Sequence, residues 1–115
     1  EKCQKIGIKI LPISKKSSVD LFGNFQALFW ALDNMYKYGQ LNNEGILKSL
    51  KAKISGAREI LEKQKETGKK AAINKLEAVI AEIEAQKDKH LNEDGFIVIK
   101  GFCNNLIAQT KEKVF

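Results

Sequence analysis

The chain has 115 residues, 43% of them hydrophobic, which is enough for one domain with a single core and too little for two. No apolar run approaches the roughly 20 residues needed to cross a bilayer, and no signal-peptide pattern is visible. The net charge of +6 comes almost entirely from lysine, because Arg58 is the only arginine. Lysine lacks the planar fork that suits phosphates and base edges, so this charge is weak support for nucleic-acid binding.

Residues 1–18 differ from the rest of the sequence. Isoleucine alternates with lysine or glycine over residues 5–11, up to Pro12, which predicts an extended arm or a short strand. Residues 15–18 are typical of a linker. A single strand has no ladder partner, so the arm either packs on the rest of the chain or ends a preceding β-domain. Residues 19–115 then form the folded module.

Two amphipathic helices are expected next, over residues 20–38 and 44–66, because apolar residues recur three and four positions apart. The first is the most aromatic part of the chain. Its rings are expected in the core with Trp30 on the flank, which would leave no ring on which a base could stack. Gly56 in the second helix costs about 1 kcal/mol relative to alanine, and this indicates a close helix approach or a tolerated defect.

The third helix is expected over residues 70–89, after a loop at residues 65–69. A lone helix of this length is marginal in water, so the other segments must cover its apolar side. The fourth element, over residues 94–111, is ambiguous. Its β-branched run between Gly95 and Gly101 favours a strand when taken alone, whereas the longer window follows helical spacing.

A motif that recurs fifty residues apart favours the helix. Leucine is expected to close the preceding helix onto the core, and asparagine to cap the next helix, whose first turn holds an acidic residue. The sequence therefore predicts an all-α fold: a four-helix bundle made of two repeated helical hairpins, with a short extended N-terminal arm. The two capping turns contain Leu41, Asn42 and Gly45 in the first copy, and Leu91, Asn92 and Gly95 in the second.

Four segments together resemble the FIMAH family of helical modules. They are residues 41–43 followed by 46–50, then 70–78 and 83–86, and the similarity covers about residues 22–110. That family occurs as an accessory module of secreted and cell-surface bacterial proteins, often after catalytic or immunoglobulin-like domains, and it has no established catalytic residues. The resemblance implies a secreted or cell-surface accessory domain that is not an enzyme.

His90 is the only histidine. A metal site needs clustered ligands and a general base needs a positioned partner, so His90 is interpreted as a residue that complements a helix dipole. The spacing of Asn92, Asp94 and Gly95 is that of a calcium loop, but His90 and Gly101 would then occupy its first and twelfth positions, which require oxygen ligands. No metal, cofactor or catalytic residue is expected.

The two cysteines, Cys3 and Cys103, lie at opposite ends of the chain. A disulfide between them would fasten the arm to the last helix and close a loop of about 100 residues, which stabilises by up to ~4.7 kcal/mol in the chain-entropy model. The alternative is two unrelated thiols, with Cys103 acting as a small buried hydrophobe. A secreted protein favours the disulfide, and a protein in a reducing compartment favours the thiols.

The leading hypothesis for function is a non-catalytic accessory module that acts as a spacer or attachment domain. Its partner would be a cell-wall polymer, a glycan or another protein, and a lysine-rich surface would attract acidic polymers in a salt-dependent way. The alternatives are a small basic helical binding protein of the bacteriocin-immunity kind and, with less support, a nucleic-acid binder.

Overall fold

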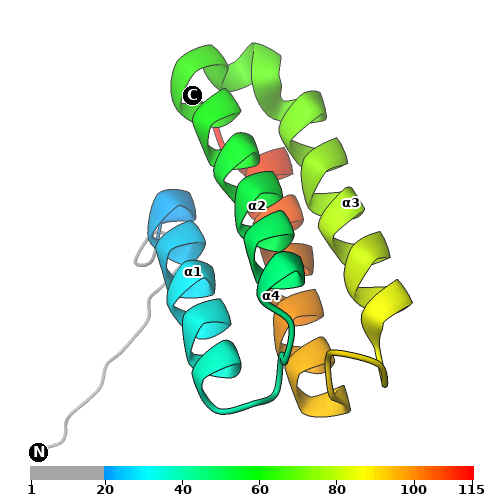
Figure 1. The fold of residues 1–115 in the computed structure, drawn as a ribbon. Coiled ribbons are helices and arrows are strands. Elements are labelled where there is room, and N and C mark those ends of the chain that lie inside the picture. The colour runs from blue at the N-terminus through cyan, green and yellow to red at the C-terminus, as the bar shows by residue number, and fades with distance from the viewer. Residues whose placement is uncertain (1–19) are drawn as a thin grey trace, which may run out of the picture.

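The computed structural model describes residues 20–115, which form four α-helices in an antiparallel bundle (Figure 1). The predicted all-α four-helix bundle is confirmed. The extended arm over residues 1–18 and its strand at 5–11 lie outside the described residues. The helices are α1 (Leu21–Lys37), α2 (Glu44–Gln64), α3 (Lys69–Gln86) and α4 (Glu93–Glu112), and a short 3₁₀ helix, η2 (Lys65–Gly68), joins α2 to α3.

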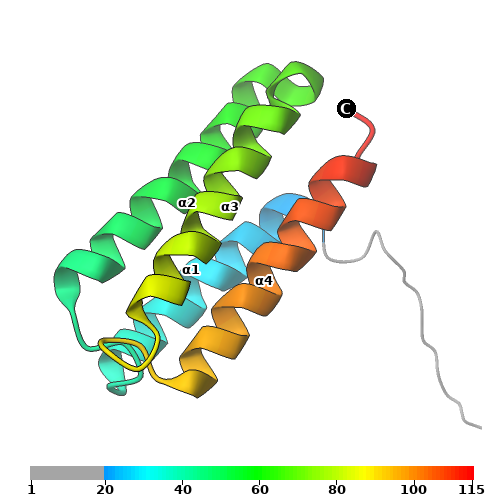
Figure 2. The same cartoon turned by 90° about the vertical axis from the view of Figure 1, so that its right-hand side faces the viewer.

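The bundle is closed, because α1 packs against α4 as well as against α2. The remaining contacts, α2 with α3 and α3 with α4, complete a ring of four helices. Figure 2 shows α2 and α4 on opposite sides of α3. Short connections between neighbouring antiparallel helices are typical of this architecture. Every helix therefore has one side toward the common core and one side toward solvent.

The ambiguous fourth element is a helix. Residues 20–115 contain no strand, and the run after Gly95 lies inside α4. Helical spacing buries Ile99, Cys103 and Leu106 together, whereas Ile97 and Val98 remain exposed. The tertiary contacts of the buried stripe override the β-propensity of the isolated segment.

Two predicted boundaries are wrong. The third helix ends at Gln86 rather than at residue 89, since Asp88 adopts a left-handed conformation with φ of 66° and Leu91 then folds back toward Gln86. The segment after Gln64 is the 3₁₀ helix η2 rather than a loop. Its Gly68 is buried against α2, because a Cβ atom there would lie 2.6 Å from Cγ2 of Ile60.

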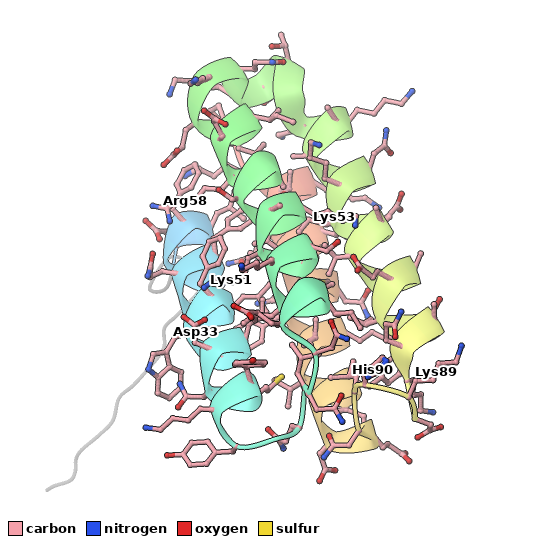
Figure 3. The ribbon with its side chains drawn as sticks, viewed as in Figure 1. Asp33, Lys51, Lys53, Arg58, Lys89 and His90 are labelled. Atoms are coloured by element: carbon pink, nitrogen blue, oxygen red, sulfur yellow. The ribbon has the colours of Figure 1, made fainter. Side chains whose placement is uncertain are left out.

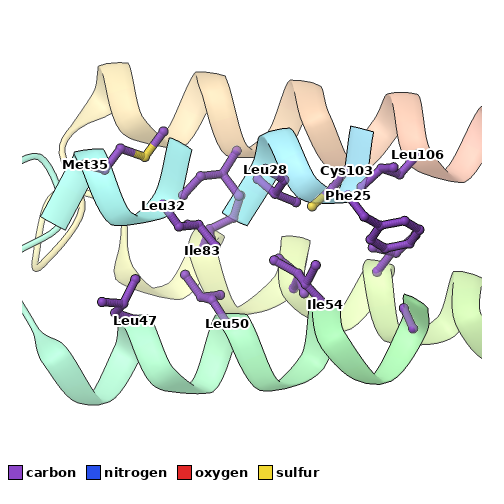
Figure 4. Close-up of a cluster of buried hydrophobic side chains, with 14 of the residues drawn as sticks. Phe25, Leu28, Leu32, Met35, Leu47, Leu50, Ile54, Ile83, Cys103 and Leu106 are labelled. Carbon is purple, nitrogen blue, oxygen red and sulfur yellow. The ribbon is translucent and has the colours of Figure 1, made fainter. Parts of the chain in front are cut away.

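Leucine and isoleucine from all four helices fill the core (Figure 4). Apolar burial of this kind stabilises a bundle by about 25 cal/mol per Å². Phe25 is fully buried as expected, whereas Trp30, which was expected on the flank, and Tyr38 at the end of α1 are each 70% exposed. The largest fully buried side chains are Phe25, Leu28, Leu32, Leu41, Leu50, Ile54, Leu61, Leu76, Ile83, Leu91, Ile99 and Leu106.

Polar groups also join α2 to α3. Nζ of Lys53 on α2 lies 2.7 Å from Oε1 of Glu82 on α3, and the hydroxyl of Ser49 donates to the same oxygen. One turn further along, the side chain of Lys75 lies across Gly56. The close approach expected at Gly56 is thus made by the methylenes of a lysine and not by a second backbone.

Candidate interaction surface

The two predicted capping turns meet at one end of the bundle. The backbone N–H of Asn42 donates to the carbonyl of His90, and the N–H of Asn92 donates to the carbonyl of Gln40, both at 2.9 Å. Through these reciprocal hydrogen bonds, Leu41 and Leu91 pair as an isolated antiparallel β-bridge. Both leucines are buried, as the sequence predicted, and their turns lock the α1–α2 connection to the α3–α4 connection.

The caps of the two turns differ by one position. Asn92 caps α4, since its Oδ1 accepts from the N–H of Gly95 at 2.8 Å. In the first turn the cap is Asn43, whose Oδ1 accepts from the N–H of Ile46 at 2.9 Å. The expectation that Asn42 caps α2 is therefore wrong.

Asn42 instead contacts His90 across the paired turns. Its Oδ1 lies 3.0 Å from Nδ1 of the imidazole. An amide oxygen only accepts, so the proton of this hydrogen bond belongs to Nδ1. His90 follows the end of α3 and couples the two turns through its ring and its backbone (Figure 3).

The paired turns also border a shallow open pocket of about 220 Å³, lined in part by Gln40, Asp88 and Lys89. Gly45 and Gly95 lie in the first turns of α2 and α4, and a Cβ on Gly95 would come within 2.9 Å of Cδ1 of Leu91. Within residues 20–115, no three His, Cys, Asp or Glu side chains are grouped closely enough to hold a metal ion. The residues of this end are explained by capping and by turn pairing.

Cys103 lies in the core and is fully buried. Burial raises the pKa of its thiol to about 12, so the nucleophilic thiolate is scarce at neutral pH. Cys3 is outside the described residues, and the disulfide between the two cysteines stays a prediction.

The opposite end of the bundle holds both ends of the described chain. Phe22 near the start of α1 and Phe115 at the C-terminus line one open pocket of about 410 Å³, together with Lys65 of η2. The ammonium of Lys69 donates to the carbonyls of Lys111 and Lys113, which satisfies the last turn of α4. The start of α1 and the end of α4 therefore lie at the end of the bundle remote from the paired turns (Figure 1).

The outer sides of the helices differ in chemistry. Ion pairs run along α2, for example Lys63 with Glu59 at 2.9 Å and Arg58 with Glu62 at 3.3 Å. The hydrogen bond and charge of Lys63 hold the pKa of Glu59 below its usual value. Such alternation of charge is typical of a solvated helix face.

The outer sides of α1 and α4 are apolar by comparison. Within residues 20–115, the large hydrophobic side chains that are exposed belong to α1 and its C-cap, to α4 and to the C-terminal tail. The two charged side chains of α1 are not in the middle of its outer side. Asp33 pairs with Lys51 of α2 at 2.8 Å (Figure 3), and Lys37 is in the last turn of α1. We call this surface the α1–α4 face and define it by Trp30, Asn34, Tyr38, Ile97, Val98 and Asn105.

Sequence reasoning missed the α1–α4 face, although a signal for it exists. Between Asp94 and Lys111, α4 has a single charged residue, Lys100. That residue lies 3.6 Å from Glu84 of α3, so it points to the other side of α4. Exposed aromatic and β-branched residues without charges among them are the composition that marks the centre of a protein interface.

Most of the net positive charge of the chain belongs to residues 1–19. Residues 1–19 contain five lysines and Glu1, a net charge of +4, whereas residues 20–115 contain 15 basic and 13 acidic residues, a net charge of +2. The attraction of acidic polymers by a lysine-rich surface stays a prediction. The bundle itself is close to neutral.

Comparisons with known protein families, with curated proteins and with solved structures returned no match. The resemblance to the FIMAH family stays a prediction. In the part of the chain that the structure describes, none of the helices combines the length and the apolar character needed to cross a membrane.

Proposed function

We propose that this chain is a non-catalytic helical attachment module that binds a protein surface through its α1–α4 face. The observation that carries the proposal is the exposure of Trp30, Tyr38 and Ile97, at 70%, 70% and 57%, on two neighbouring helices whose shared outer face is almost free of charge. Exposed aromatic residues are the commonest anchors of protein interfaces. The FIMAH-like segments are the reason to place such a module in a secreted or cell-surface protein.

The start of α1 and the end of α4 lie at the same end of the bundle, where Phe22 and Phe115 line one pocket. A spacer between two domains needs its attachment points on opposite sides, so this arrangement supports attachment over spacing.

The charges support a protein partner over an acidic polymer. The bundle carries a net charge of only +2, and many of its lysines already pair with carboxylates. Surface pairs of this kind leave little net field for long-range attraction. Binding of an acidic wall polymer would therefore depend on residues 1–19 and would weaken steeply with salt.

The groups with displaced pKa values support a non-catalytic role. In residues 20–115 they are Glu59 and Lys63 on an exposed face of α2, and Cys103 in the core. Functional sites typically combine such shifts with a cleft and a second titratable group. None of these three residues has that setting.

Site-specific photo-crosslinking tests this proposal. Benzoylphenylalanine replaces Ile97 on the α1–α4 face, or Ala78 on the exposed side of α3 as the matched control, in the protein as its host makes it. We expect a discrete protein adduct from position 97 and none from position 78, and we expect Ile97→Lys to abolish binding of the purified partner. Equal labelling from both positions, or adducts with polymer alone, contradicts the proposal.

A further inference from the structure

We infer that the partner of the α1–α4 face is a second copy of this chain, which forms a weak two-fold dimer through α1 and α4. This inference rests on the proposed function, because it uses the same face and names its partner. Two features of the face support a second copy as the partner: its size and the absence of charge at its centre.

The face is large enough for a weak dimer. Helices of 17 and 20 residues are about 25 and 30 Å long, and two of them side by side are roughly 20 Å wide, so their shared face measures about 550 Å² in projection. Specific interfaces begin at about 600 Å² of accessible surface per partner, and accessible surface exceeds the projected area of a rough face. The expected affinity is micromolar rather than nanomolar.

The uncharged centre favours self-association in particular. In a two-fold dimer each patch faces a copy of itself, so any unpaired charge near the axis meets an identical charge. The exposed side of α2 carries such charges, including Lys48 and Lys63. The middle of the α1–α4 face, around Val98 and Asn34, carries none.

Trp30 makes the dimer observable, since it is the only tryptophan in the chain and lies on this face. Sedimentation velocity and tryptophan emission are measured on the full 115-residue chain from about 1 μM to 1 mM, a range that brackets a micromolar dissociation constant. We expect the mass to rise from 12.9 kDa toward twice that value as the concentration increases. The emission of Trp30 should shift to shorter wavelength over the same range.

Two lysine substitutions test the face. Val98→Lys, or Ile97→Lys if the first variant is poorly folded by circular dichroism, should weaken self-association at least about tenfold, because it brings like charges together at the axis. Ala78→Lys on α3 adds the same charge away from the face and should leave self-association unchanged.

A chain that remains monomeric up to 1 mM overturns the inference. A dimer that survives both face variants, or that forms without a change in Trp30 emission, also overturns it. The proposed function has a separate test, because a monomeric chain that still crosslinks from position 97 to a different protein refutes the dimer and leaves the attachment function standing.

Discussion

Alanine at Gly68 and alanine at Gly56 should change the stability of the bundle in opposite directions. Both glycines have right-handed, negative φ values, so alanine brings no backbone strain at either position. The two sites differ in what the new Cβ atom meets. The comparison therefore isolates packing from backbone preference.

At Gly68 the new Cβ atom would lie 2.6 Å from Cγ2 of Ile60 and 3.0 Å from its carbonyl oxygen. A methyl group cannot occupy that space unless η2 moves away from α2. Overpacking of this kind costs typically 1–3 kcal/mol, so we expect Gly68→Ala to lower the free energy of unfolding by about 2 kcal/mol.

At Gly56 the nearest atoms are Cδ and Cε of Lys75, at 3.2 and 3.3 Å. These atoms belong to a flexible, solvent-reaching chain that can shift by a few tenths of an ångström. Alanine is about 1 kcal/mol better than glycine inside a helix, so after the displacement of Lys75 we expect Gly56→Ala to stabilise by about 0.5 kcal/mol.

Urea denaturation followed by circular dichroism measures both effects. With an m-value of about 1–1.5 kcal/mol/M, the midpoint should fall by 1–2 M for Gly68→Ala and rise by about 0.3–0.5 M for Gly56→Ala. Equal destabilisation by both substitutions would refute the distinction between a contact with α2 and a contact with a mobile lysine. A neutral Gly68→Ala would show that the packing of η2 on α2 is loose.

Further predictions concern the caps, an ion pair and the core thiol. Asn43→Ala should destabilise by about 1 kcal/mol in urea denaturation, and Asn42→Ala by less than half as much, because only Asn43 caps α2; equal losses would contradict the assigned cap. NMR titration should place the pKa of Glu59 below its ordinary value, and Lys63→Ala should return it. Because the folded-state pKa is lowered, the pair stabilises above the unfolded pKa of Glu59, and this contribution disappears as the pH falls through the folded value. Cys103 should resist thiol reagents at pH 8 in the native protein and react once urea unfolds it, since burial raises its pKa to about 12; rapid native-state labelling would contradict the buried position.

Local patterns predicted the helices because they are visible in short windows. The three- and four-residue spacing of apolar side chains is enough to place the buried stripe that includes Leu76 and Ile83, and the recurring leucine and asparagine are enough to locate the two turns. The spacing and the recurring residues can be recognised without knowing how the helices pack against one another. The helical assignment of residues 94–111 was also correct, but it depended on the motif that recurs fifty residues away, because the local β-branched run favours a strand.

The incorrect predictions concern local features that depend on contacts with residues far away in the sequence. Asn42 and Asn43 are chemically equivalent caps, and only the hydrogen bond from Asn42 to the carbonyl of His90 selects Asn43 for α2. The third helix stops at Gln86 because Leu91 must reach Leu41, although the polar residues between are compatible with a helix. A short sequence window around Asn42 does not contain His90, and one around Leu91 does not contain Leu41.

The α1–α4 face was missed for a related reason. Its residues come from segments nearly seventy positions apart, and they become neighbours only when α4 returns to α1 and closes the ring. Trp30 alone is an exposed tryptophan on one helix. Together with Ile97 and Val98 it is part of a continuous uncharged surface.

The requirements of the fold do not explain that surface. A four-helix bundle needs apolar residues on the inner side of each helix, and α2 and α3 meet this requirement while keeping charged outer sides. The same rule applied to α1 and α4 would place lysine or glutamate at Trp30, Ile97 and Val98, at no loss of core packing, because these side chains are exposed. Exposed aromatic and β-branched residues lower solubility and contribute little to folding. The presence of these residues on two adjacent helices is therefore best explained by a surface that is covered when the protein works.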